Sequence, residues 1–482
     1  MTDNTSLFDA IVRDPENDAV RLVYADWLEE QGDIQRAEFI RVQCDLDGLV
    51  ETDPQRPALR TREAVLYSNH RKKWFGPLRK YTRRFEVERG FPERLVLSLD
   101  ELADQGPQVL QHSPVGHLRL KGIRKPYDRF RDCHTLQHTR TLNLDANAVG
   151  QQFLKEVWDD SHLLGLRTLI LNNNPIRQTG LNLLLKSNSH PELHTLMLRR
   201  CRLEGEAAPL LLESPIMAQL RHLAVEIDGL SDHQLAPVRS EPQLRSLYLT
   251  GEHDKPILAP FVKTGVLHKL ESLEIDCPMT AEDVEALAEL PSLQRLALGR
   301  SAFFLPSCEA IWKVISLPKL RELRVPFPTP EGMLRPALLE PLRWLQIDGP
   351  PMIPLDSLEF LANTRELANL EVLNLVHPNI TFEGIKQFAT ANHFERLSVL
   401  RIISVVEIDD MWKEFATTQQ FPNLHTIITS TTTSSRANEA LTDRFGSDCL
   451  LHQKPYFAGS SVSILNFFNA TPLDRLEPPS YG

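Results

Sequence analysis

Apolar residues recur along most of the chain in one pattern: an apolar residue, two variable residues, an apolar residue, one variable residue and a third apolar residue. Successive copies start 22 to 28 residues apart. The clear copies begin at Leu166, Leu193, Leu220, Leu244, Leu270, Leu293, Leu320, Leu342, Leu370 and Leu397. Alternation at the last two apolar positions of each copy predicts a short strand with one buried face.

Segments with a helical pattern separate these strands. In residues 280–288, Thr280 can cap a helix whose Val284 and Leu287 share one face. A strand and a helix at this period resemble the leucine-rich repeat of the ribonuclease-inhibitor-like subclass, which implies parallel strands stacked into a horseshoe. The predicted fold is therefore α/β: a curved solenoid over residues 92–430, with short parallel strands on the concave face and helices outside. We expect a C-terminal cap over residues 431–456 and a flexible tail over residues 457–482.

The loop after each strand carries a second signal. In leucine-rich repeats, the third residue after the last strand leucine is often Asn or Cys, which bonds the loop backbone of adjacent turns. Asn174 and Cys201 occupy this place here. Later repeats lose the pattern, and we expect less regular loops around Asp228, Ser301, Pro328, Pro350 and Pro378.

The first ninety residues follow a helical pattern without the repeat. A first helix ends before Pro15, a second runs from about Asp18 to Gly32, and Asp33 can cap a third. We therefore expect a small all-α domain over residues 1–50. A basic helical connector, which caps the N-terminal end of the solenoid, is expected over residues 51–91.

Part of this segment resembles a known family. Residues 24–30 read YADWLEE and residues 37–43 read AEFIRVQ. Together they resemble the repeat-companion domain found in planctomycete bacteria at the head of leucine-rich-repeat proteins. The resemblance implies this architecture and a bacterial, cytoplasmic origin. It implies no catalytic residue, because the family has no established activity to carry over.

Charge disfavours nucleic acid as a general ligand, because 64 acidic residues outnumber 53 basic ones and phosphate binding depends on Lys and Arg. Residues 54–90 are the local exception. Basic side chains interleaved there with Trp74 and Tyr81 could hold a nucleic-acid backbone or an acidic partner while the rings stack on bases. Alternatively, the rings pack on the solenoid and the charges are solvated or pair with the acidic helices. The possible contacts for an anionic partner are Arg71, Lys72, Lys73, Arg79 and Lys80.

Motifs for catalysis or cofactor binding do not occur, so we predict neither an enzyme nor a cofactor. His190 and His194 have a zinc-like spacing only on a helix, and Pro191 indicates a loop, so no metal site is predicted. Six scattered cysteines are typical of reduced, buried side chains. The N-terminus does not resemble a signal peptide, and no apolar run is long enough to cross a bilayer. We therefore expect a cytoplasmic protein without membrane contact.

Residues between and beside the strand leucines point to the concave face, because neighbouring strand residues alternate sides. Several apolar ones fall on consecutive repeats, and an exposed apolar patch usually marks an interaction site. Alternatively, the tail of the chain covers this patch, or irregular turns bury it. The predicted partner-binding residues are Trp344, Val372, Val376, Val399, Arg401, Ile403, Tyr248 and Arg324.

The sequence thus predicts a non-catalytic scaffold that binds an unknown protein partner through the concave face. An adaptor that contacts nucleic acid or an acidic partner through residues 71–84 is the first alternative. An uncharacterised enzyme is the second. The sequence does not fix the oligomeric state.

Overall fold

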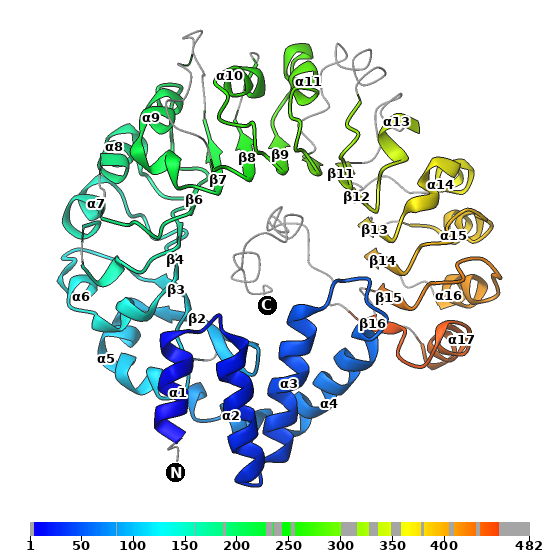
Figure 1. Cartoon of the computed structure of the whole chain (residues 1–482), viewed down its shortest axis with the longest axis horizontal. Coiled ribbons are helices and arrows are strands. Elements are labelled where there is room, and N and C mark those ends of the chain that lie inside the picture. Colours follow the sequence, from blue (N-terminus) through cyan, green and yellow to red (C-terminus); the bar gives the residue numbers. More distant parts are fainter. Residues whose placement is uncertain are drawn as a thin grey trace.

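A computed structural model of the chain describes residues 4–82, 84–159, 161–186, 189–227, 235, 243–251, 256–299, 316–326, 336–348, 358–376, 380–403, 409–429 and 434–452. The described strands form one sheet whose order follows the sequence from β1 to β16. Figure 1 shows these strands on the inner side of a ring, with helices on its outer side. This arrangement confirms the predicted leucine-rich-repeat solenoid.

All neighbouring strands pair in parallel except β1 and β2, which form an antiparallel hairpin. The strands are β1 (Phe85–Glu88), β2 (Phe91–Ser98), β3 (His117–Lys121), β4 (Thr141–Asn143), β5 (Thr168–Ile170), β6 (Thr195–Leu198), β7 (His222–Glu226), β8 (Ser246–Thr250), β9 (Ser272–Asp276), β10 (Arg295–Leu298), β11 (Glu322–Pro326), β12 (Trp344–Asp348), β13 (Val372–Val376), β14 (Val399–Ile403), β15 (Thr426–Thr429) and β16 (Leu450–His452).

Helices of the repeats lie outside the sheet and are mostly short. The α-helices are α5 (Leu99–Leu110), α6 (Asp128–Arg131), α7 (Gln151–Val157), α8 (Arg177–Lys186), α9 (Ala207–Glu213), α10 (Leu258–Lys263), α11 (Ala281–Leu287), α13 (Pro336–Leu339), α14 (Glu359–Asn363), α15 (Phe382–Phe388), α16 (Asp409–Ala416) and α17 (Ser435–Phe445). The 3₁₀ helices are η1 (Leu78–Lys80), η2 (His134–His138), η3 (Ser161–Leu163), η4 (Pro215–Ala218) and η7 (Arg365–Asn369).

The strand leucines form one continuous core between sheet and helices. The predicted cap of α11 is present, because the Thr280 side chain accepts a hydrogen bond from the Asp283 backbone and Asp283 reciprocates. Asp283 also links two repeats. Its buried Oδ1 accepts from three backbone N–H groups at the start of α10, at 2.8 to 3.0 Å. A single carboxylate thus caps two successive helices.

Asn174 and Cys201 bond adjacent turns as expected. The Asn174 amide donates to the carbonyl oxygens of Leu144 and Leu171, both at 2.9 Å, and its Oδ1 accepts from the backbone of Val149 at 3.0 Å. The Cys201 thiol donates to the Leu171 carbonyl at 3.2 Å. The five loop positions at which the sequence departs from this pattern lie outside the described residues, namely Asp228, Ser301, Pro328, Pro350 and Pro378. The predicted tail over residues 457–482 lies outside them as well.

The N-terminal helices are α1 (Asn4–Arg13), α2 (Asp18–Glu30), α3 (Ile34–Gly48) and α4 (Arg56–Phe75). Gly32 ends the turn after α2 with a φ of +84°, as its position predicted. The helical connector expected over residues 51–91 contains α4 and η1 but ends in a strand, β1. Residues 85–88 alternate in character and pair with β2, and Gly90, with a φ of +88°, makes the turn between the two strands.

Helices α1–α4 lie next to both ends of the sheet and not only next to its first repeat. Figure 1 shows α1–α4 between the first strands of the sheet and its last strands, so that they close the ring. On one side, Arg167 before β5 donates to Glu16 at 2.6 Å. On the other side, Arg401 of β14 donates to Glu51 at 3.1 Å, across 350 residues of sequence. The loop between α3 and α4 therefore contacts the C-terminal repeats directly.

Closure of the ring can be tested by cross-linking. Cysteines introduced by Glu51→Cys and Arg401→Cys should react together with a short bismaleimide, because their parent side chains are hydrogen-bonded. Mass spectrometry of the digested protein would identify the linked peptides. As a control, Glu51→Cys should not link to Asp128→Cys on the outer helix α6. Equal yields for the two pairs would contradict the closed ring.

Candidate functional site

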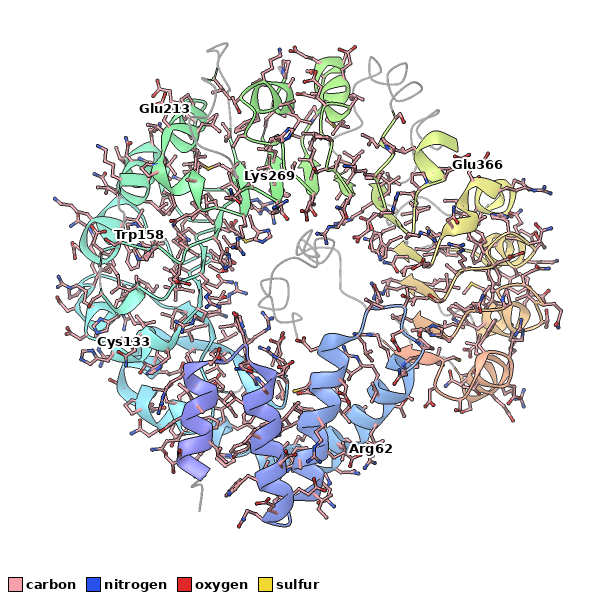
Figure 2. The ribbon with its side chains drawn as sticks, in the orientation of Figure 1. Arg62, Cys133, Trp158, Glu213, Lys269 and Glu366 are labelled. Atoms are coloured by element: carbon pink, nitrogen blue, oxygen red, sulfur yellow. The ribbon has the colours of Figure 1, made fainter. Side chains whose placement is uncertain are left out.

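The inner wall of the ring is built from rows of side chains, one from each strand. Figure 2 shows side chains that project from the strands into the central space. The register places Trp344 beside Val372 and Val372 beside Val399. A second row places Val376 beside Ile403. The pairing of β12, β13 and β14 therefore brings Trp344, Val372 and Val399 together, whereas the polar row of Gln346, Asn374 and Arg401 separates them from Val376 and Ile403.

Two valines of this group are less exposed to solvent than predicted. Val372 and Val399 were expected to face solvent, but their exposed fractions are 3% and 0%. Side chains on neighbouring strands lie about 4.8 Å apart, so these valines pack on each other. Ile428 and Trp344 pack against them. Trp344, Val376 and Ile403 remain half-buried.

Trp344 lies outside the leucine core, as its position predicted. It packs on Ala297 of β10 on one side and on the valine row on the other. Leu345, the next residue, is fully buried in the core. The two neighbouring side chains therefore belong to opposite faces of β12.

Tyr248 belongs to a separate apolar group on the inner wall, with Ile170, Met197 and Ala224. Only 4% of Tyr248 is exposed. The guanidinium of Arg199 lies over its ring, 4.4 Å from the centroid. Burial raises the pKa of Tyr248, so its hydroxyl stays protonated. This residue stabilises the wall and offers little surface to a partner.

The two arginines predicted as anchors are engaged within the chain. Arg324 donates to Asp348 on the next strand at 2.5 Å, and Arg401 donates to Glu51 of the N-terminal domain. Both side chains stay partly exposed. A partner would have to compete with these ion pairs.

The basic segment before the solenoid has exposed charges but packed rings. Arg71, Lys72, Lys73, Arg79 and Lys80 are exposed, and Lys73 pairs with Asp33 at 2.9 Å.

The aromatic residues Trp74 and Tyr81 of that segment are half-buried and pack on other rings. Trp74 packs on Phe39 and His70, with ring centroids 5.1 and 4.9 Å away, and Tyr81 stacks on His112. Nucleic-acid binding of the type considered needs accessible rings. The packing therefore favours the alternative in which these rings serve the fold.

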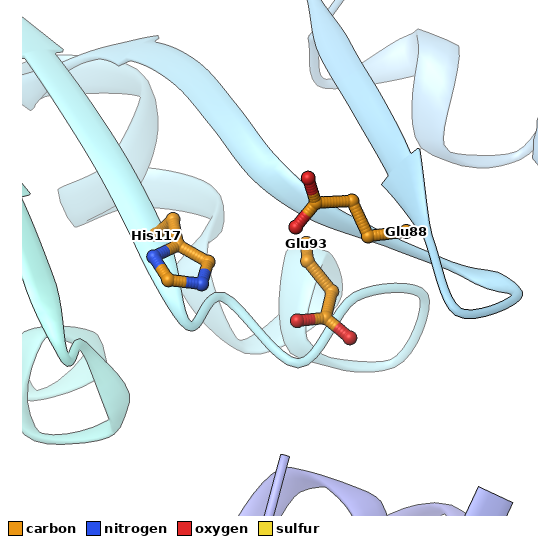
Figure 3. Close-up of side chains that lie close together, drawn as sticks. All are labelled: Glu88, Glu93 and His117. Atoms are coloured by element: carbon orange, nitrogen blue, oxygen red, sulfur yellow. The ribbon is translucent and has the colours of Figure 1, made fainter. Parts of the chain in front are cut away.

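A further cluster, which sequence reasoning missed, joins the hairpin to β3. Glu88, Glu93 and His117 place one possible ligand atom each within 4.8 Å of one another (Figure 3). Glu93 has the same parity as the core leucines Leu95 and Leu97, which puts its carboxylate on the buried face. A charged residue at a core position of a strand was the signal that could have found it.

Arginine side chains already form ion pairs with the carboxylates of Glu88 and Glu93. Arg21 of α2 is fully buried and contacts Glu93, and Arg89 lies 3.6 Å from the same carboxylate. Arg94 pairs with Glu88 at 2.6 Å. A metal ion would have to compete with three guanidinium groups here.

Burial dominates the electrostatics of this cluster. Burial raises the pKa of Glu93 in spite of Arg21 and Arg89. Burial and, next, the nearby Arg94 lower the pKa of His117 to about 3. His117 is therefore neutral near pH 7, and its Nδ1 lies 2.9 Å from the Thr141 hydroxyl. The cluster is best described as an ion-paired junction between the N-terminal helices and the first repeats.

Comparison with known proteins adds little beyond the fold. No protein-family description and no curated protein matches the chain. A leucine-rich-repeat protein of Leptospira interrogans matches at 15% identity and a TM-score of 0.31, over 75% of this chain and 90% of that one. A chain of the yeast Rad7–Elc1 complex matches at 14% identity and a TM-score of 0.33, over 86% and 92%. These likenesses transfer no function. Within the described part of the chain, no helix is long and apolar enough to span a membrane.

Removing the buried guanidinium of the junction should destabilise the protein strongly. Arg21→Ala leaves the buried Glu93 short of a cation, and breaking such a pair costs about 3–5 kcal/mol. Arg41→Ala is the matched control, because Arg41 pairs with Asp26 and Glu29 at the surface and should contribute less than about 1 kcal/mol. Urea unfolding of both variants measures the difference. Equal losses of stability would show that the junction does not depend on this pair.

Stability should fall as the pH drops from about 6.5 towards 4. Burial lowers the pKa of His117 to about 3, and the pKa values of His190 and His222 to about 4. The unfolded chain takes up these protons near pH 6.5, so acid favours the unfolded chain. Urea unfolding across this pH range measures the effect, and His117→Gln should reduce the slope. A slope unchanged by this substitution would rule out a contribution from His117.

Proposed function

We propose that this chain is a non-catalytic scaffold that binds a partner protein on the inner wall of its ring. The observation that carries the proposal is the half-buried Trp344 beside the valine row of β13 and β14. An indole offers a large contact area with few rotors to order, and Trp is favoured among the residues that dominate binding energies.

The surroundings of Trp344 support such a contact. Val376 and Ile403, both half-buried, add apolar surface two rows away, beyond the row of Gln346, Asn374 and Arg401. Arg324 and Arg401, which pair with Asp348 and Glu51, lie in the polar row between these two apolar rows. Protein interfaces usually combine apolar contacts with polar groups that can form hydrogen bonds.

The setting we propose is the cytoplasm of a bacterium, with α1–α4 as a companion domain of the repeats. Five cysteines are described, and all are buried and free. Burial raises the pKa of Cys44, Cys201 and Cys277 to about 12, so these thiols are unreactive. Buried, reduced cysteines are typical of intracellular proteins.

A pair of substitutions on adjacent residues tests the binding surface. Affinity purification from the native cell with mass spectrometry would first supply the partner. Trp344→Ala should then weaken binding by about 2 kcal/mol or more, because it removes the proposed anchor. It should leave folding almost intact, since Trp344 lies outside the leucine core.

Leu345→Ala is the matched control. Its side chain is fully buried in the core, so its loss should cost about 2–5 kcal/mol of stability through the cavity it leaves. Calorimetry of binding and urea unfolding separate the two effects. Unchanged affinity in a folded Trp344→Ala protein would refute the proposed site.

A further inference from the structure

A cationic cavity lies at the beginning of strands β7, β8 and β10. Its volume is about 340 Å³. Arg221 and Arg245 immediately precede β7 and β8, and Arg295 is the first residue of β10. Together with Glu271 they are the charged residues of the lining. Three guanidinium groups therefore face one carboxylate, although the whole chain carries a net charge of −11.

The ion pairs of the cavity leave positive charge uncompensated. Arg245 donates to Glu271 at 2.8 Å. Among the described residues, Arg221 and Arg295 have no ion pair or side-chain hydrogen bond. Arg295 lies opposite Glu322 in the next strand, and burial raises the pKa of Glu322 to about 7. Glu322 is thus only partly ionised near neutral pH and offsets only part of the charge of Arg295.

Arginines at the equivalent position of other repeats form side-chain bonds within the chain, whereas Arg221 has none among the described residues. Arginine also precedes other strands of the sheet, and there its side chain bonds to a neighbouring loop or carboxylate. Arg140 donates to the Gly165 carbonyl, and Arg343 donates to Glu371. Arg321 donates to the Pro341 carbonyl at 3.3 Å. Arg221 occupies the same place in its repeat and extends, exposed, at the cavity.

Two neutral groups of the lining also lack partners. His222 Nδ1 and Ser246 Oγ are buried and have no hydrogen-bond partner in the part of the chain that the structure describes. A buried polar atom without a partner costs about 1–3 kcal/mol, so such atoms call for an explanation. Both can hydrogen-bond to a bound anion that displays several oxygen atoms.

We propose that this cavity binds a phosphate group. Guanidinium groups match phosphate with two parallel N–H···O bonds, and Arg221 and Arg295 are available for this geometry. Arg245 adds charge from between them, and Ser246 and His222 complete the set of hydrogen-bonding groups. The phosphate can belong to a small molecule or to a phosphorylated side chain of a partner, since the recognised group is the same.

Calorimetric titration of the full-length protein at constant ionic strength tests the site. The probes are inorganic phosphate and capped phosphoserine, with capped serine as the uncharged reference. We expect saturable binding of phosphate that Arg221→Gln weakens by about tenfold or more, or ~1.4 kcal/mol. Arg221→Lys should lose less, because it keeps the charge but not the paired geometry.

Arg321→Gln is the matched control, because Arg321 holds the same place in another repeat and bonds to backbone carbonyls. It should leave phosphate affinity unchanged, and melting temperatures would confirm that all variants fold. Tighter binding of capped phosphoserine than of phosphate assigns the site to a phosphorylated side chain, and the reverse order assigns it to a small molecule. Absence of binding, or equal affinities for the wild type and a folded Arg221→Gln protein, would overturn the proposal.

Discussion

Parallel pairing between successive strands is the constraint on which the other features of this protein depend. Each repeat has one apolar face that it can bury only against its neighbours, so the leucines form one core along the whole sheet. The same register sets the inner wall, because it places each side chain beside its counterpart in the next repeat. Trp344 meets Val372 and then Val399 for this reason, although about 27 residues of chain separate successive strands.

The N-terminal helices meet the solenoid through apolar packing on Phe91 and through a buried group of charges. Arg21, Glu93 and Arg89 form a buried group between α2 and the start of β2, with Arg36 donating to the Gly90 carbonyl nearby. A buried ion pair contributes little to net stability, but each of its members becomes costly without the others. Because each charged group must meet its partner at a defined position, such a junction fixes how the helices are placed on the first strands.

The sequence predicted the parts of the fold that depend on local or periodic signals. Strand positions followed from the leucines, the cap of α11 from Thr280 and Asp283, and the bonding between turns from Asn174. Burial on the inner wall could not be predicted in the same way, because Val399 is covered by residues of other repeats. The contact of Glu51 with Arg401 combines residues whose proximity depends on the curvature of the whole solenoid. Nothing in the spacing of the leucines encodes that curvature.

Closure of the ring changes how the solenoid can come apart. An open repeat array frays from its terminal units, because each of these has only one neighbour. Here the loop between α3 and α4 reaches β14 through Glu51, and the carbonyl oxygen of Thr52 lies 3.2 Å from Nε2 of His425. The last repeats therefore have a second neighbour, supplied by the beginning of the same chain. Unfolding from the C-terminal repeats must therefore begin with detachment of the N-terminal helices. This requirement couples the first and the last described repeats in a single cooperative unit.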